Sequence, residues 1–115
     1  MAVGTEWIVD AEGCDSSRLR DLHAVRGVVE RLVAALDLHV VGEGQWHVFP
    51  GEGGVTGLYL LTESHVACHT YPETRTATFN LYCCRAREAF DWHAELARAL
   101  GAKDTRVRVI ERGRP

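Results

Sequence analysis

Residues 55–84 read VTGLYLLTESHVACHTYPETRTATFNLYCC, and this stretch decides the fold. Runs rich in β-branched and aromatic residues at 55–62, 66–71 and 76–84 predict three successive strands. Pro72 separates the second run from the third, because proline has no amide hydrogen to give to a sheet ladder. The glycine-rich residues 51–54 predict a flexible loop before the first of these strands.

Helix and strand patterns flank this stretch on both sides. Apolar residues recur at threes and fours from residue 17 to 36 and predict one amphipathic helix; residues 86–100 predict a second, which Gly101 ends. Shorter strands are expected at 5–10 (an edge strand), 38–41, 45–50 and 105–111. Because strands and helices do not alternate regularly, the sequence predicts an α+β two-layer sandwich. We expect a mainly antiparallel sheet with two helices on one face, and the other face could hold a partner.

Composition limits the class of protein. A chain of 115 residues, 46% hydrophobic and 25% charged, is typical of one globular domain over residues 1–115. The formal net charge of −3 predicts no nucleic-acid partner, and the C-terminal arginines are interpreted as a solvated strand edge and tail. No run approaches the ~20 apolar residues that span a bilayer, so no membrane partner is expected. Without a signal-peptide pattern, we expect a cytoplasmic protein whose four cysteines are free thiols.

Residues 62–73, TESHVACHTYPE, concentrate a hydroxyl, two imidazoles, a thiol and two carboxylates. One interpretation is a polar strand face without a function. A second is a metal site, but His65 and His69 would lie ~13 Å apart along a strand, so we expect no metal. A third is a nucleophile at Ser64 beside these histidines, although no GxSxG turn indicates an ordinary esterase. Spacing alone leaves these alternatives open.

The motif ESHxxxHTxPE, at residues 63–73, resembles the self-processing site of bacterial S-adenosylmethionine decarboxylases. The resemblance extends over most of the chain, through residues 47–49 and 54–57 before the motif, 79–84 after it, and Arg112-Gly113 near the end. It implies that the Ser64 hydroxyl attacks the Glu63 carbonyl and that the chain breaks there. The products would be a β chain, residues 1–63, and an α chain, residues 64–115, which begins with a pyruvoyl cofactor derived from Ser64.

The same resemblance assigns roles to individual residues. His69 matches the processing histidine, and Thr56 matches a hydroxyl that steadies the processing intermediate. A strained turn at the Glu63–Ser64 bond could assist the attack. In turnover the pyruvoyl group would form a Schiff base with the substrate amine, and Cys84, rather than its neighbour Cys83, would return the proton.

The substrate pocket is assigned in the same way. Glu73 matches the carboxylate that holds the ribose hydroxyls of S-adenosylmethionine, and His65 would lie beside the pyruvoyl group. Phe49 and Tyr82 are candidate aromatic contacts, for which core packing is an equal alternative. Glu6 replaces a histidine that is usual in the family.

Such departures in the pocket wall leave the substrate open. S-adenosylmethionine, for spermidine and other polyamine biosynthesis, is the first expectation. L-Ornithine or L-arginine is the alternative. Glu6 could then pair with the cationic end of the substrate side chain, but Arg85 would argue against this pairing if it faced the pocket. An unprocessed homologue that only binds a ligand or a partner is a third possibility. The resemblance further implies a homodimer of processed protomers whose active sites form where the protomers meet.

Overall fold

The protein is described by a computed structural model over residues 3–84 and 89–113. In chain order the elements are β1 (Gly4–Glu12), α1 (Ser16–Leu19), α2 (Leu22–Ala35), β2 (Gln45–Val48), β3 (Val55–Leu60), β4 (Ser64–Tyr71), a 3-10 turn (Pro72–Thr74), β5 (Thr76–Cys83), α3 (Trp92–Leu100) and β6 (Asp104–Arg112). The strands form one antiparallel sheet in the order β2-β3-β4-β5-β1-β6.

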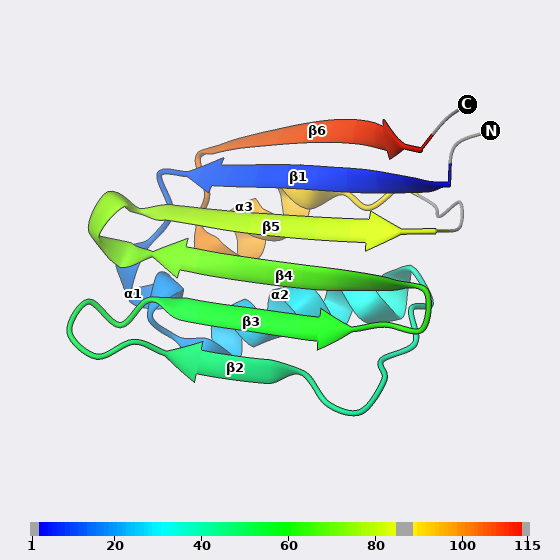
Figure 1. Cartoon of the computed structure of the whole chain (residues 1–115). Helices are drawn as coiled ribbons and strands as arrows, with labels where there is room; N and C mark the ends of the chain where they lie inside the picture. The colour runs from blue at the N-terminus through cyan, green and yellow to red at the C-terminus, as the bar shows by residue number, and fades with distance from the viewer. Residues whose placement is uncertain (1–2, 85–88, 114–115) are drawn as a thin grey trace.

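The helices lie together on one side of this sheet, which we call the helix face (Figure 1). The other side, turned toward the viewer, is called the open face, and none of the described helices covers it. The predicted α+β sandwich is therefore confirmed, with the short α1 added to the two expected helices. Within the part of the chain that the structure describes, no helix combines the length and apolar character needed to cross a membrane.

Alternation along the strands sorts the side chains between the two faces. Val66 and Cys68 of β4, and Phe79 and Leu81 of β5, are buried on the helix face. They belong to one core with buried residues of the helices: Leu19, Val25, Val28, Val29, Leu32, Leu96 and Leu100. Because full burial of one such side chain stabilises a fold by ~1.5–3 kcal/mol, this core holds the helices on the sheet.

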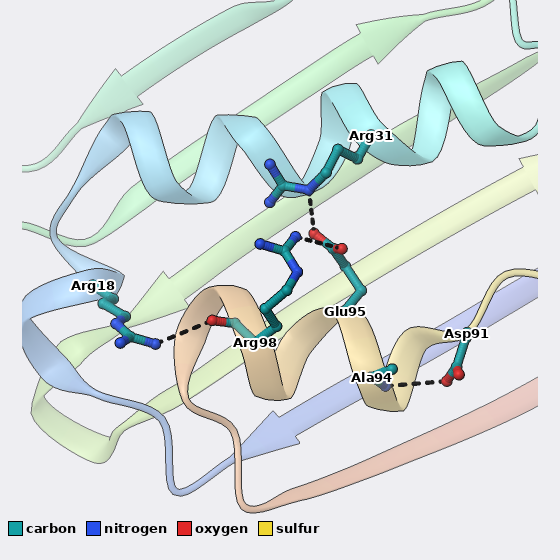
Figure 2. Close-up of polar contacts among 6 residues, drawn as sticks. All are labelled: Arg18, Arg31, Asp91, Ala94, Glu95 and Arg98. Atoms are coloured by element: carbon teal, nitrogen blue, oxygen red, sulfur yellow. Dashed lines mark hydrogen bonds and ion pairs between the residues drawn. The ribbon is translucent and has the colours of Figure 1, made fainter.

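Polar contacts join the helices at the surface (Figure 2). The Glu95 carboxylate of α3 accepts hydrogen bonds from Arg31 of α2 at 2.7 Å and from Arg98 at 2.8 Å. The Asp91 side chain caps α3, and Arg18 of α1 donates to the Arg98 carbonyl at 3.2 Å. Exposed ion pairs contribute only ~0–1 kcal/mol each, so these contacts orient helices that the core already holds.

Two predicted helices have different bounds in the structure. The helix expected over 17–36 is interrupted after α1, because the Asp21 side chain accepts a hydrogen bond from His23 N–H and caps a new helix, α2. The helix expected over 86–100 begins at Trp92, where Asp91 is the cap. The first part of that prediction, residues 86–88, lies outside the described residues.

Two strand predictions are corrected as well. The strand at 5–10 was expected at an edge, but β1 pairs with both β5 and β6, and β6 is the edge strand on that side. The strand expected at 38–41 is reduced to a single bridge between Val40 and Leu61. The strand expected from residue 66 begins earlier, at Ser64.

Thr70 is a buried polar link among three elements. Its Oγ1 donates to the Leu19 carbonyl of α1 at 2.7 Å and accepts from the Val55 N–H of β3 at 2.9 Å. The side chain belongs to β4 and is 5% exposed. It therefore satisfies a carbonyl and an amide that water cannot reach.

Thr70→Val is expected to lower the free energy of unfolding by ~2–4 kcal/mol, because it leaves the carbonyl and the amide buried without a partner. Urea denaturation measures the change. The matched control is Thr105→Val, since Thr105 is also buried but its hydroxyl makes no hydrogen bond within the described residues. We expect the control to cost less than ~1 kcal/mol. Equal losses in the two variants would contradict the role given to the Thr70 hydroxyl.

Candidate active site

Four of the residues assigned from the family resemblance line one cavity of about 430 Å³. We call it the His69 cavity. Its lining includes the predicted site residues Phe49, Thr56, His69 and Glu73, together with Glu52, Gly54, Thr70 and Tyr71. The cavity is therefore formed by three parts of the chain: the loop before β3, β3 itself, and β4 with the turn that follows it. The aromatic, imidazole and carboxylate groups are those that a nucleoside-type ligand would use.

The sheet register brings two residues of this cavity, Thr56 and His69, together. Thr56 of β3 lies opposite His69 of β4, and Thr56 Oγ1 is 3.2 Å from His69 Nδ1. Both side chains are on the open face, because the buried residues Val55 and Thr70 take the other side of their strands. This contact can hold the imidazole in one orientation.

Loops complete the cavity around this pair. The Phe49 N–H donates to the Gly54 carbonyl at 2.8 Å, which closes the predicted glycine loop, and the His47 ring packs edge-on against Phe49 at 4.6 Å. A Cβ at Gly54 would lie 2.6 Å from the Thr70 carbonyl oxygen, so the approach of the loop to β4 requires glycine. Glu73 lies in the 3-10 turn that follows β4. The loop and the turn therefore set the two sides of the cavity.

The predicted cleavage bond lies in a tight hairpin between β3 and β4. Leu61 N–H donates to the Ser64 carbonyl at 2.9 Å, so Thr62 and Glu63 form the tip, and both Glu63 and Ser64 are half-buried. The expected backbone strain is not found at this bond: among the described residues, the non-glycine residues with positive φ are Asp37 and Arg75. The bond therefore lies at the end of the sheet, and neither Glu63 nor Ser64 has the left-handed backbone conformation.

Cysteines adjoin Ser64 across the sheet. Ser64 lies opposite Cys83, which is buried, and the next residue, Cys84, is exposed. Burial raises the pKa of Cys68 to about 12, so that thiol stays protonated in the core. Cys14 is buried as well, so among the four thiols Cys84 is the one open to a substrate, consistent with the preference for Cys84 over Cys83.

The adjacent rung of the sheet carries the remaining predicted residues. His65 of β4 lies opposite Tyr82 of β5, which lies opposite Glu6 of β1. The His65 and Tyr82 rings are 5.8 Å apart. A hydrogen bond from Asn80 and an ion pair with Arg112 hold the pKa of Glu6 below its usual value, although partial burial opposes them. We call the group around Ser64, Cys84 and this rung the Ser64 end.

The His69 cavity and the Ser64 end are separate on one chain. Four residues of extended strand lie between Ser64 and His69, and the five residue steps correspond to ~17 Å at the usual rise. The predicted site residues therefore form two groups at opposite ends of the sheet, and Ser64 itself lies on the same side of β4 as the buried Val66 and Cys68. Phe49, Thr56, His69 and Glu73 form one group, and Glu6, Glu63, Ser64, His65, Tyr82 and Cys84 form the other.

Several residues beside these groups were not predicted from the sequence. Tyr71 lines the His69 cavity, and its position two residues after His69 on the same strand was a signal for it. Glu52 lines the same cavity from the glycine loop. Arg112 and Asn80 contact Glu6 through strand pairings that no local pattern reveals. No group of three metal-ligating side chains is found in residues 3–84 and 89–113.

Comparisons with known proteins identify the family of this chain. The family model described as S-adenosylmethionine decarboxylase matches residues 5–113. An S-adenosylmethionine decarboxylase proenzyme of Pyrobaculum aerophilum is 33% identical over 96 residues, covering 80% of this chain and 76% of that protein. An arginine decarboxylase proenzyme of Aeropyrum pernix is 40% identical over 73 residues, covering 63% of this chain and 54% of that protein.

A solved structure gives the same result for the fold. The crystal structure of the adenosylmethionine decarboxylase of Aquifex aeolicus superimposes with a TM-score of 0.79 at 25% identity, covering 99% of this chain and 93% of that one. The family match spans nearly the whole chain and includes both groups of site residues. The chain belongs to the S-adenosylmethionine decarboxylase family.

Proposed function

We propose that this protein is a pyruvoyl-dependent carboxy-lyase that decarboxylates S-adenosylmethionine and so supplies the aminopropyl donor of polyamine biosynthesis. The observation that carries the proposal is the placement of the Glu63–Ser64 bond at a hairpin, with Ser64 opposite Cys83 and the exposed Cys84 next in the chain. Relatives named as proenzymes of this decarboxylase support the assignment. The free thiols fit the reducing cytoplasm, which we propose as its compartment.

The residues at the Ser64 end fit a pyruvoyl group made from Ser64. Ser64 directly follows the Glu63 carbonyl that its hydroxyl would attack, and Glu63 lies at the tip of the hairpin. A pyruvoyl carbonyl supplies an electron sink for decarboxylation that no ordinary side chain offers. Cys84 holds the proton that must be delivered to the substrate carbon after CO₂ has left, and His65 lies beside the residue that bears the group.

The His69 cavity fits the remaining parts of the substrate. The Glu73 carboxylate can accept two hydrogen bonds from ribose hydroxyls, and Phe49, 51% exposed, can present its ring to the adenine or to the sulfonium. Thr56 orients His69, which we assign to the elimination step of self-processing. These roles are inferred from the matched motif positions and the geometry of the cavity.

We further propose that the active enzyme is a homodimer joined through the open faces. Large apolar side chains remain exposed on that face, at Phe49, Leu58, Leu60, Tyr71 and Ile110. A face this apolar is typical of an interface. A second copy packed antiparallel on it would bring the His69 cavity of one protomer to the Ser64 end of the other, although the two lie ~17 Å apart on one chain.

Arginine is the second candidate substrate, because relatives at 40% and 27% identity are named arginine decarboxylase proenzymes. Ornithine, like arginine, is an α-amino acid whose side chain ends in a cation. Release of labelled CO₂ from carboxyl-labelled S-adenosylmethionine, arginine and ornithine tests the choice. We expect release from S-adenosylmethionine, abolished when a hydrazine blocks the carbonyl. Release from arginine or ornithine alone would move the assignment to that substrate, and release from none would favour an unprocessed binding protein.

A further inference from the structure

The Glu6 carboxylate already accepts hydrogen bonds from two residues of its own chain. Its Oε1 accepts a hydrogen bond from Arg112 Nη1 at 2.8 Å, and its Oε2 accepts one from Asn80 Nδ2 at 2.5 Å. The Glu6 side chain is 19% exposed, whereas the Arg112 side chain is 56% exposed. The lowered pKa of Glu6 keeps the carboxylate charged, and the guanidinium balances that charge.

The same guanidinium also contacts the aromatic wall of the Ser64 end. Its carbon lies 5.7 Å from the centroid of the Tyr82 ring, which is within the range of a cation–π contact. The Tyr82 ring lies over Gly4, where a Cβ would overlap the phenol. Arg112 thus joins Glu6 and Tyr82, two residues on the rung next to Ser64.

The position of Glu6 matters for substrates with a second cation. Glu6 lies two strands from β4, ~10 Å at the usual strand spacing. An amino acid whose amine is held at residue 64 and whose side chain ends in an ammonium or guanidinium has the length to approach this carboxylate. Because Arg112 and Asn80 already bind Glu6, such a substrate would find no free carboxylate to accept its hydrogen bonds.

A sulfonium has different requirements. Its sulfur carries no N–H or O–H, so it does not need a carboxylate to accept a hydrogen bond when it is buried. Its charge can be stabilised over the face of an aromatic ring. A neutralised Glu6 therefore discriminates against ammonium and guanidinium groups more strongly than against a sulfonium.

We propose that Arg112 is a specificity-determining residue of the Ser64 end. Because its guanidinium pairs with the Glu6 carboxylate, it disfavours binding of amino acids whose side chains end in an ammonium or guanidinium. The site is then selective for the sulfonium substrate. The inference rests on the proposed function and narrows its substrate class.

Kinetics of Arg112→Met test the inference. The ratio of kcat/KM for arginine or ornithine to that for S-adenosylmethionine is expected to rise by at least ~10-fold, because Glu6 becomes free to accept the distal cation. Adding Glu6→Gln should remove the rise. Arg106→Met is the matched control, since Arg106 pairs with Glu12 at the far end of the same two strands, and its ratio should match the wild type. A ratio within ~2-fold of wild type in Arg112→Met would overturn the inference.

A second measurement covers the case in which Arg112→Met does not mature. In the uncleaved Ser64→Ala background, the rise in thermal midpoint caused by arginine or ornithine should be larger with Arg112→Met than without it. Equal shifts would overturn the inference. Failure of the proposed function looks different, because the wild type would then neither cleave itself nor release CO₂ from any substrate. A cleaved wild type that prefers arginine would keep the pyruvoyl mechanism and refute the role of Arg112.

Discussion

Two inactive variants, Ser64→Ala and His69→Ala, are expected to restore self-cleavage to each other when co-expressed. Neither variant should cleave alone, because one lacks the nucleophile and the other lacks the imidazole. In a mixed dimer, His69 of the Ser64→Ala chain can reach Ser64 of the partner chain if the active site forms between protomers. With equal amounts and random pairing, about half of the His69→Ala chains should be cut. Mass spectrometry of differently tagged chains measures the fraction.

The control for this experiment is His69→Ala co-expressed with a chain that carries both substitutions. No functional imidazole is then available to any Ser64, so all chains should remain intact. Absence of cleavage in the first mixture, with mixed dimers demonstrated by the tags, would contradict the proposal that the two ends of the sheet meet across a dimer. Cleavage would show directly that the ~17 Å separation on one chain is bridged by the second protomer.

Cys84→Ala is expected to lower kcat by ~10²–10⁴-fold while self-cleavage continues, because the loss of a positioned proton donor affects turnover. Decarboxylation rates and intact masses measure the two effects separately. Cys83→Ala is the control: its side chain is buried in the core, so we expect lower thermal stability with kcat close to that of the wild type. A large fall in kcat for Cys83→Ala and not for Cys84→Ala would reverse the assignment of the proton donor.

The sequence predicted best those features that depend on neighbours along the chain. The three strands between residues 55 and 84 follow from local alternation and turn residues, and they form the centre of the sheet. The break before α2 was missed because the apolar spacing continues through Asp21, while the cap is a local polar contact. The edge position assigned to β1 was wrong because β6 comes from the other end of the chain, and local periodicity carries no information about that pairing.

For the site, the motif identified residues but not their arrangement. Thr56 and His69 were assigned separate roles, and the register of β3 and β4 places them in contact. His69 and Ser64 were expected to act together, yet an extended strand keeps them apart on one chain. For the alternative substrates ornithine and arginine, Glu6 was the candidate partner of the side-chain cation, whereas Arg112 and Asn80 already bind it. These differences arise from strand pairing, which the sequence pattern does not specify.

The most direct test of the proposed mechanism is the intact mass of the purified wild-type protein beside that of Ser64→Ala. The proposed function predicts two wild-type fragments, residues 1–63 and 64–115, the second beginning with a pyruvoyl group in place of serine. The variant should remain one uncut chain. A single uncut chain in the wild type as well would contradict self-processing and favour a protein that only binds its ligand.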